Sequence, residues 1–591
     1  MLSFLFAFGF RMAFATAETP DSWATYYELS GYTKTPRYAE TIAYCRRLSG
    51  ASPWVKYLTF GTSAQGRDLP LVVVSKDRAF TPEQAARQGK AVILIQSGIH
   101  AGEIDGKDAS LMLIRDIAIR KTYSRLLDNT ILLFVPMFNV DGHERFGPYN
   151  RINQNGPEEM GWRVTAQNIN LNRDYMKADT PEMRAMLRLF SAWLPDFMID
   201  CHVTDGIDFQ YDLTYAVELG SNSKPVVSQW IRKDLLPPSI EQVERSGHKI
   251  FYYVFPREDK DLSKGLTAEA ATPRFSTGYF ALQNRPSLLI ETHMLKPYKT
   301  RVEGTYELLK ALIGTINADP RALRSAVREA DEATIREGRT YDPASVYPLR
   351  FGLGGKSTPR RFLGVESHTE RGEISGADFQ HYTTSPRDAT IPFFDEITVE
   401  DSVSIPLAYL VPPEWNFVGN VLDAHGVHYK RLTQPATVEV ESYSFSNVRW
   451  GAKPYEGRQV VTCSTKAIRE RRTYPVGSLL VRMDQRAARV AMHLLEPRAP
   501  DSFVSWGFFN AIFEQKEYAE SYVMEGIGRK MLSADPELRG EFENRLRADT
   551  LFAGNPRARL NWLYMRSPWR DPLLNVYPVG RVVTEEQFKT E

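Results

Sequence analysis

Three short apolar runs in this sequence end at side chains that bind metal ions or transfer protons. The run 91–95 leads to His100 and Glu103, which two residues separate. A second run ends at His202 and a third ends at Glu291. Catalytic zinc sites combine three imidazole or carboxylate ligands with an open position for water. The sequence therefore offers three metal ligands and a further carboxylate that could act as a general base.

These side chains can act together only if the strands that carry them are neighbours in one sheet. In open α/β sheets, ligands gather outside the carboxyl ends of the strands. Each apolar run is short and continuous, as in a buried central strand, and has its candidate residue at the end. A lone His-x-x-Glu pair often occurs by chance, so the prediction of one site depends on the joint placement at three strand ends.

The elements around these runs indicate a layered α/β domain. Thr180 and Pro181 have the residue types of a helix N-cap and first helical position, and Asp319 with Pro320 starts a second helix in the same way. Strands and helices that alternate at these lengths predict a mixed sheet with helices on both faces. The predicted strands lie within 55–60, 71–75, 91–95, 131–138, 197–205 and 287–293, and predicted helices cover 35–47, 181–193 and 302–315, with another in the turns after Asp105.

Length and composition are those of a globular chain of several domains. The 591 residues suggest about three or four domains. The formal net charge of +1 does not indicate the basic surface that is typical of nucleic-acid-binding proteins. No internal stretch approaches the run of about 20 apolar residues that spans a bilayer. We expect an α/β domain over 25–337, a β-rich accessory region over 338–500 with a linker-like break at 351–359, and a helical region over 501–591.

The first residues resemble a secretory signal peptide. An apolar run covers 2–10, and Ala15 and Ala17 form a small-x-small cleavage site. No basic residue precedes the apolar run, and Arg11 interrupts the segment. We expect residues 1–17 to direct export to a periplasm or to the outside of the cell.

Other conspicuous side chains have structural interpretations. The three cysteines lie far apart in the sequence and do not have the spacing of metal ligands. We expect Cys201 to be a buried thiol that packs in the core. His293, two residues past Glu291, is expected to support the site or the fold rather than to be a fourth ligand. An aromatic cluster near the C-terminus is expected to pack the helical region onto the preceding domain; it comprises Trp506, Phe508, Phe509 and Phe513.

The first 310 to 340 residues or so resemble the M14 family of zinc metallocarboxypeptidases, the carboxypeptidase A-like group. Several motifs carry the resemblance, in the order that the family has them. They are GIHAGE at 98–103, FNVDGHE at 138–144, GWR at 161–163, NINLNRD at 168–174, His202, and IET at 290–292.

The resemblance implies a role for each residue of the expected site. His100, Glu103 and His202 would bind one zinc ion, and Glu291 would be the general base and acid that activates the zinc-bound water. Arg163 would polarise the scissile carbonyl.

A second group of residues would bind the substrate or support the site. Asn172 and Arg173 would hold the terminal carboxylate of the substrate. Tyr279 is the candidate for the mobile tyrosine of the family. Asn170 stands where the family usually has Asp, so a neutral amide oxygen would support His100 and leave it less basic. Val203-Thr204 replaces the family's Ser-Tyr at a distal subsite.

The expected activity is removal of the C-terminal residue from peptides that have a free carboxylate. One alternative is a zinc amidase or deacylase that acts on cell-wall stem peptides or acylated amino acids. Another is a peptide-binding protein without catalysis, which the presence of every catalytic residue type disfavours. The sequence predicts neither the oligomeric state nor the preferred side chain of the substrate.

Overall fold

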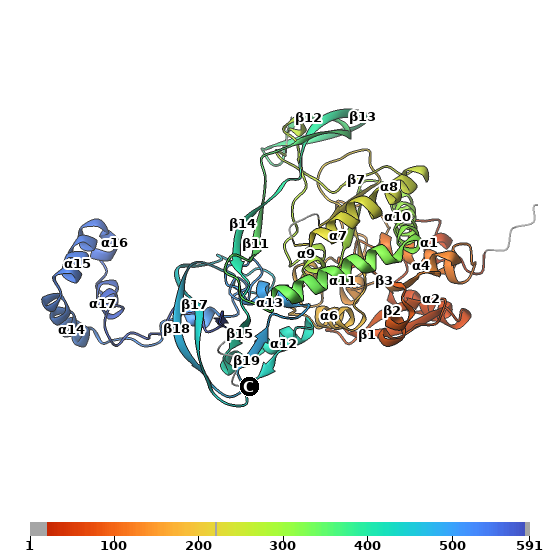
Figure 1. Ribbon diagram of the computed structural model, residues 1–591. Helices are drawn as coiled ribbons and strands as arrows, with labels where there is room; N and C mark the ends of the chain where they lie inside the picture. The colour runs from red at the N-terminus through yellow and green to blue at the C-terminus, as the bar shows by residue number, and fades with distance from the viewer. Residues whose placement is uncertain (1–20, 219–221, 260, 585–591) are drawn as a thin grey trace, which may run out of the picture.

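An eight-stranded mixed sheet forms the centre of the first half of the chain, with strand order β1-β2-β4-β3-β5-β10-β6-β7 (Figure 1). The computed structural model describes residues 21–218, 222–259 and 261–584, so the predicted leader at 1–17 lies outside the described residues. All the predicted strands of this domain are present, with ends shifted by a few residues. The strands are β1 (Val55–Thr62), β2 (Asp68–Val74), β3 (Ala91–Ser97), β4 (Thr130–Val135), β5 (Phe197–Val203), β6 (Leu213–Val217), β7 (Ile250–Tyr252) and β10 (Ser287–Thr292).

The central strands β4, β3, β5 and β10 pair in parallel, so their carboxyl ends share one edge of the sheet. Every residue of β3 and β5 is buried, which agrees with their continuous apolar sequences. In the pairing of β10 with β5, Glu291 lies directly opposite His202. The register therefore brings together two residues that are far apart in the sequence.

Helices cover both faces of this sheet, as the sequence predicts. Successive side chains on a strand point to opposite faces, and on β3 Leu94 joins one hydrophobic core while Ile93 and Ile95 join another. On the Leu94 face lie α6 (Pro181–Trp193) and α9 (Ser276–Leu282). On the other face lie α2 (Tyr38–Ala51), α4 (Asp105–Ala118), α7 (Pro225–Trp230), α8 (Leu236–Arg245), α10 (Tyr298–Ala318) and α11 (Pro320–Glu337).

The accessory region is built on a six-stranded sheet that packs against the first domain. Phe190 of α6 and Tyr409 of the accessory sheet belong to one continuous cluster of buried side chains. The two parts thus share a core. The sheet has the order β16-β19-β15-β20-β17-β18. Its strands are β15 (Ala408–Val411), β16 (Lys430–Arg431), β17 (Ala436–Trp450), β18 (Val461–Tyr474), β19 (Leu479–Arg482) and β20 (Gly580–Val582), with helices α12 (Phe417–Ala424) and α13 (Ala488–Leu495) beside them.

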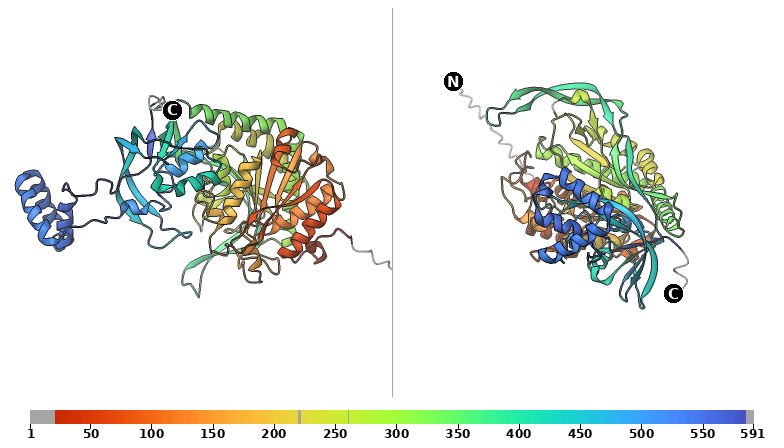
Figure 2. Two further views of the ribbon diagram at one scale, coloured as in Figure 1. Left: turned by 90° about the horizontal axis from the view of Figure 1, so that it is seen from below. Right: turned by 90° about the vertical axis from the view of Figure 1, so that its left-hand side faces the viewer.

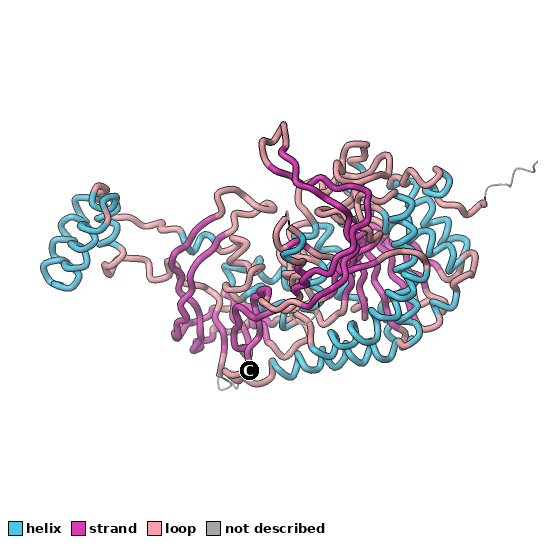
Figure 3. Tube along the Cα trace, turned by 90° about the horizontal axis from the view of Figure 1, so that it is seen from above, coloured by secondary structure: helices cyan, strands magenta, loops and turns pink. Residues whose placement is uncertain are grey.

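A long hairpin reaches from the accessory region back over the first domain (Figures 1 and 3). It consists of β12 (Thr358–Arg371) and β13 (Asp378–Phe394), and β13 extends a small sheet through β9 (Leu266–Thr267) and β8 (Phe255–Pro256). The linker-like break predicted at 351–359 is a loop over residues 354–357 only. β11 (Val346–Leu353) and β14 (Ile397–Ser404) pair with each other here, and β12 starts at Thr358.

The C-terminal region contains the predicted helices and one strand that the sequence did not indicate. Helices α14 (Ser521–Ala534), α15 (Pro536–Ala548), α16 (Thr550–Ala553) and α17 (Pro556–Tyr564) form a module with its own core. The module stands away from the eight-stranded and the six-stranded sheet (Figure 2). The segment 501–509 forms turns instead of helix. After the module, β20 enters the accessory sheet between β15 and β17.

A buried carboxylate holds β20 in the accessory sheet. Glu496 has no solvent exposure and accepts hydrogen bonds from the hydroxyls of Tyr409 and Tyr443 at 2.5 and 2.9 Å. The guanidinium of Arg581, on β20, lies 2.9 Å from the same carboxylate. Removing one partner of a buried pair costs about 3–5 kcal/mol because the other charge remains buried. Glu496→Ala should therefore lower the urea midpoint of unfolding, whereas Glu543→Ala on the exposed face of α15 should not. Equal midpoints for the two variants would contradict this role.

Candidate functional site

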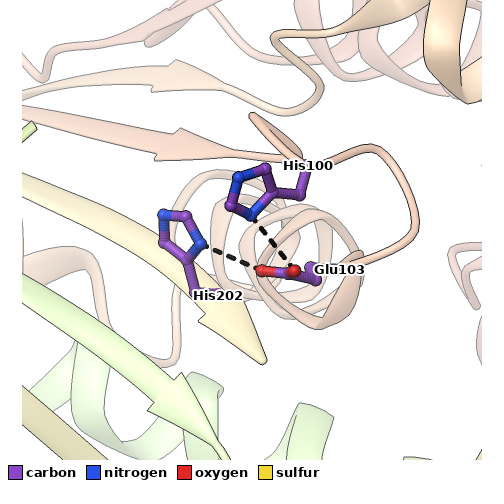
Figure 4. Close-up of side chains that lie close together, drawn as sticks. All are labelled: His100, Glu103 and His202. Atoms are coloured by element: carbon purple, nitrogen blue, oxygen red, sulfur yellow. Dashed lines mark hydrogen bonds and ion pairs between the residues drawn. The ribbon is translucent and has the colours of Figure 1, made fainter. Parts of the chain in front are cut away.

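His100, Glu103 and His202 form a buried cluster at the carboxyl edge of the sheet (Figure 4). His100 Nδ1 lies 3.1 Å from Glu103 Oε1, and His202 Nδ1 lies 2.9 Å from Glu103 Oε2. One ligand atom from each residue lies within 4.8 Å of the others. The structure thus brings together the three residues that the sequence predicts to be metal ligands.

Glycines shape the turn from β3 to α4 that carries His100 and Glu103. Gly98 has φ of +66°, a conformation that favours glycine. A Cβ on Gly102 would lie 2.6 Å from the Arg151 side chain and 2.8 Å from the Gly161 carbonyl oxygen. Because both distances are too short, only glycine lets these segments close around the cluster.

The outer nitrogen of each imidazole is held by an oxygen. His100 Nε2 lies 3.1 Å from Asn170 Oδ1, the contact that the sequence predicts for this residue. His202 Nε2 lies 2.9 Å from Asp200 Oδ2. Asp200 was not among the predicted residues, although its position two residues before His202 on a strand puts it on the same face. Since Nε2 is occupied in both rings, Nδ1 is the atom directed at Glu103.

Burial and the neighbouring charges set the protonation of the cluster. Burial lowers the pKa of His100 to about 4, although Glu103 opposes the shift. Burial would also lower the pKa of His202, but the Asp200 and Glu103 carboxylates raise it well above its usual range. Burial would raise the pKa of Glu103, but His100 and Arg151 hold it well below its usual range. These shifts favour an ionised Glu103 and a neutral His100, the forms in which both bind metals, and they favour a charged His202, which must lose its proton to bind one.

The donor set fits one divalent ion such as zinc. Two imidazole nitrogens and one carboxylate are ligands of catalytic zinc sites. The buried Nδ1 of His100 faces Glu103 Oε1 at 3.1 Å but forms no hydrogen bond with any described residue. The oxygens of Asn170 and Asp200 fix the orientation of the two rings, as is usual for metal-bound histidines.

Two arginines approach the same oxygen of Glu103. Nη1 of Arg163 lies 3.0 Å from Glu103 Oε1, and Nη1 of Arg151 lies 2.9 Å from it. The Arg163 side chain is 37% exposed, so it lies at the rim of the site, whereas Arg151 is nearly buried. The sequence did not predict Arg151, because no motif surrounds it.

Glu291 lies beside the cluster at the end of β10, directly opposite His202. Its side chain is buried, and Oε2 has no hydrogen-bond partner among the described residues. Burial raises the pKa of Glu291 to about 8, with Glu103 and Asp205 adding to the shift and His202 opposing it. A buried carboxyl group with a raised pKa is typical of a general acid or base.

Arg173 and Asn172 lie at a different part of the site from the cluster. The Arg173 guanidinium lies over the ring of Phe275, 4.2 Å from its centroid. Asn172 Oδ1 accepts a hydrogen bond from the backbone N–H of Ser276 at 3.3 Å. No contact joins either side chain to His100, Glu103 or His202 in the part of the chain that the structure describes.

The expectation that Tyr279 binds substrate needs correction. Tyr279 has no solvent exposure, and its hydroxyl lies 2.9 Å from His425 Nδ1 and accepts a hydrogen bond from Gln283. It also stacks on Tyr175 inside the core. Tyr253 lies nearer the cluster, and its pKa is raised by burial and then by the Glu291 carboxylate. No local motif marks Tyr253, so sequence reasoning could not find it.

Comparison with known protein sequences finds similarity to carboxypeptidases. Residues 41–225 match the family model of the zinc carboxypeptidases. Carboxypeptidase 2 of Trichophyton tonsurans is 24% identical over 500 residues, which cover 80% of this chain and 84% of the relative. Carboxypeptidase 2 of Trichophyton rubrum is 26% identical over 490 residues, with the same coverage of 80% and 84%.

Two solved structures also resemble this chain over about half of its length. A metallo-carboxypeptidase from Burkholderia cenocepacia is 18% identical, with a TM-score of 0.36 and coverage of 48% of this chain and 69% of that chain. Carboxypeptidase A from Helicoverpa armigera is 17% identical, with a TM-score of 0.37 and coverage of 51% and 75%.

The matched segment contains His100, Glu103 and His202, while Glu291 lies beyond it and reaches the site through the pairing of β10 with β5. Residues 41–225 therefore resemble the zinc carboxypeptidases, and 80% of the chain is similar to proteins named carboxypeptidase 2.

Proposed function

We propose that this chain is a zinc-dependent carboxypeptidase that hydrolyses the C-terminal peptide bond of peptides. The observation that carries the proposal is the placement of Glu291 directly opposite His202, beside a buried cluster of two imidazoles and a carboxylate. This arrangement supplies three metal ligands and a separate carboxylate for proton transfer at one edge of the sheet.

The ligands of the ion would be His100 Nδ1, His202 Nδ1 and the Glu103 carboxylate. A bound zinc ion would supply Lewis acidity and a water of lowered pKa. Asn170 and Asp200 keep the two rings oriented through their outer nitrogens.

Glu291 is proposed to take the proton of the attacking water and to give it to the leaving amine. In its ionised form, Glu291 can accept that proton at Oε2, which has no hydrogen-bond partner among the described residues. A raised pKa also makes the carboxyl group a competent acid in the second step. Arg163, at the rim of the site, is the cation proposed to stabilise the negative charge that develops on the carbonyl oxygen.

Arg173 and Asn172 are proposed to bind the terminal carboxylate of the substrate. The planar guanidinium matches a carboxylate in bidentate fashion, which a lysine ammonium does not. A site of this kind would require a free C-terminus and so would act only on the last peptide bond.

Arg173→Ala should lower kcat/KM for a free-acid peptide by at least about 30-fold, because loss of a paired charge from a binding site costs at least about 2 kcal/mol. The same peptide with an amidated C-terminus should be a poor substrate of both proteins. Zinc content should stay unchanged, since Arg173 does not contact the cluster. Steady-state kinetics with this matched pair of peptides measures the effect.

Arg125→Ala is the control for this variant, because the Arg125 side chain is 97% exposed. It should behave like the wild type. If the wild type cleaves amidated and free-acid peptides equally well, Arg173 is not a carboxylate anchor. The amidase or deacylase alternative would then replace the carboxypeptidase proposal.

A further inference from the structure

The turn between β17 and β18 reaches from the accessory region into the proposed substrate site. This β17–β18 turn comprises residues 451–460. The hydroxyl of Tyr455 accepts a hydrogen bond from Arg173 Nε at 3.2 Å. The Glu456 carboxylate accepts one from the backbone N–H of Asn170 at 2.8 Å. Two consecutive residues of the turn thus contact the segment that carries Asn170 and Arg173.

The β17–β18 turn is held against that segment by contacts that do not involve the Tyr455 hydroxyl. Arg458 forms a two-pronged ion pair with Asp179, with distances of 2.9 and 2.5 Å. The ring of Tyr455 stacks on the buried Trp506 with an interplanar angle of 5°. Gly457 has φ of +74° and lies so close to Ile169 that an added Cβ would be 2.9 Å from its side chain.

These contacts determine which edge of the Arg173 guanidinium remains available. Nε donates to Tyr455, and Nη1 donates to the Asn172 carbonyl oxygen at 2.8 Å. The Phe275 ring covers one face of the group. A guanidinium has five N–H donors, so three remain, all on Nη1 and Nη2. A carboxylate can therefore approach the edge formed by Nη1 and Nη2, whereas Tyr455 blocks the edge formed by Nε and Nη2.

We propose that Tyr455 is a positioning residue for the substrate: it orients Arg173 so that the Nη1 and Nη2 edge receives the terminal carboxylate. The accessory region is then a part of the substrate site. This inference rests on the proposed function, because it assigns the anchoring of the carboxylate to Arg173.

The Tyr455 hydroxyl contributes to substrate binding more than to the fold. Tyr455 is 40% exposed, so its hydroxyl can bond to water when the Arg173 contact is absent. The Arg458 ion pair and the Trp506 stack remain when only the hydroxyl is removed. Loss of the hydroxyl should leave the turn in place and release the side chain of Arg173.

The test compares Tyr455→Phe with the wild type on one peptide that has either a free or an amidated C-terminus. We expect KM for the free-acid peptide to rise about 3- to 10-fold, the size of one lost hydrogen bond. The value of kcat should stay within about twofold, because the change affects binding and not proton transfer. The slow cleavage of the amidated peptide and the melting temperature should not change.

Two further variants show whether the effect is specific to the Tyr455 contact with Arg173. Tyr522→Phe removes a hydroxyl from a residue of α14 that is 79% exposed, and it should match the wild type in every measurement. In an Arg173→Ala background, Tyr455→Phe should have no further effect on KM, because the hydroxyl acts through Arg173. An equal rise in KM in both backgrounds would show that Tyr455 acts elsewhere.

The outcomes separate this inference from the proposed function. If the wild type prefers the free-acid peptide and Tyr455→Phe leaves KM unchanged, the inference is overturned and the proposed function stands. If Tyr455→Phe impairs both peptides equally or lowers the melting temperature, the residue is structural and the inference is again overturned. If the wild type has no preference for the free acid, Arg173 is not the anchor, and both proposals fall.

Discussion

Glu291→Gln is expected to lower kcat by about 100- to 10,000-fold, the usual contribution of a general acid–base group. The amide has the shape of the carboxyl group but cannot accept the proton of the attacking water. Because Glu291 is not one of the three clustered ligands, zinc content should stay at the wild-type level. Turnover of a free-acid peptide and metal analysis of the same preparation provide the two measurements.

The matched control is Glu543→Gln, which changes an exposed residue of α15 and should leave kcat unchanged. Near-normal turnover of Glu291→Gln would identify another group as the base. His293 is the nearest alternative in the sequence, but its ring is buried and its Nε2 lies 2.7 Å from Asp208 Oδ1. We therefore expect His293 to support the loop around Asp208 and not to transfer protons.

His202→Ala is expected to abolish stoichiometric zinc binding and, with it, activity. The wild type should contain about one zinc ion per chain, and removal of one of three protein ligands leaves an incomplete site. The same variant also leaves Asp200 without its imidazole partner. Elemental analysis after dialysis measures the metal, and His428→Ala, at an exposed position outside the cluster, is the control.

A second measurement separates metal loss from misfolding. Treatment of the wild type with a chelator should remove activity, and added zinc should restore it. The His202→Ala variant should regain no activity under the same conditions. Retention of one zinc per chain in this variant would overturn the ligand assignment.

The strand ends that carry the site could be predicted because each is encoded locally. β3, β5 and β10 are short apolar runs, and a parallel sheet places the ends of such runs at one edge. The sequence thus predicted, without knowledge of the pairing, that the strand ends next to His100, Glu103, His202 and Glu291 meet. The same reasoning could have found Asp200. Residues two apart on a strand point to the same face, so Asp200 and His202 lie on one face of β5.

Contacts between distant segments could not be predicted in this way. Tyr455 and Arg173 are 282 residues apart and meet only because the accessory sheet shares a core with the first domain. The prediction that Tyr279 binds substrate was wrong for the same reason. Tyr279 faces the core between the two regions, and only the packing shows that Tyr253 lies closer to the site.

The central claim is that this chain removes one residue from a free C-terminus by zinc-dependent hydrolysis. The most direct test is mass spectrometry of a peptide and its amidated counterpart after incubation with the zinc-loaded wild type. We expect the free-acid peptide to lose its last residue, in steps of one, while the amidated peptide is cleaved far more slowly. Cleavage at an internal bond, or equal cleavage of both peptides, would contradict the account.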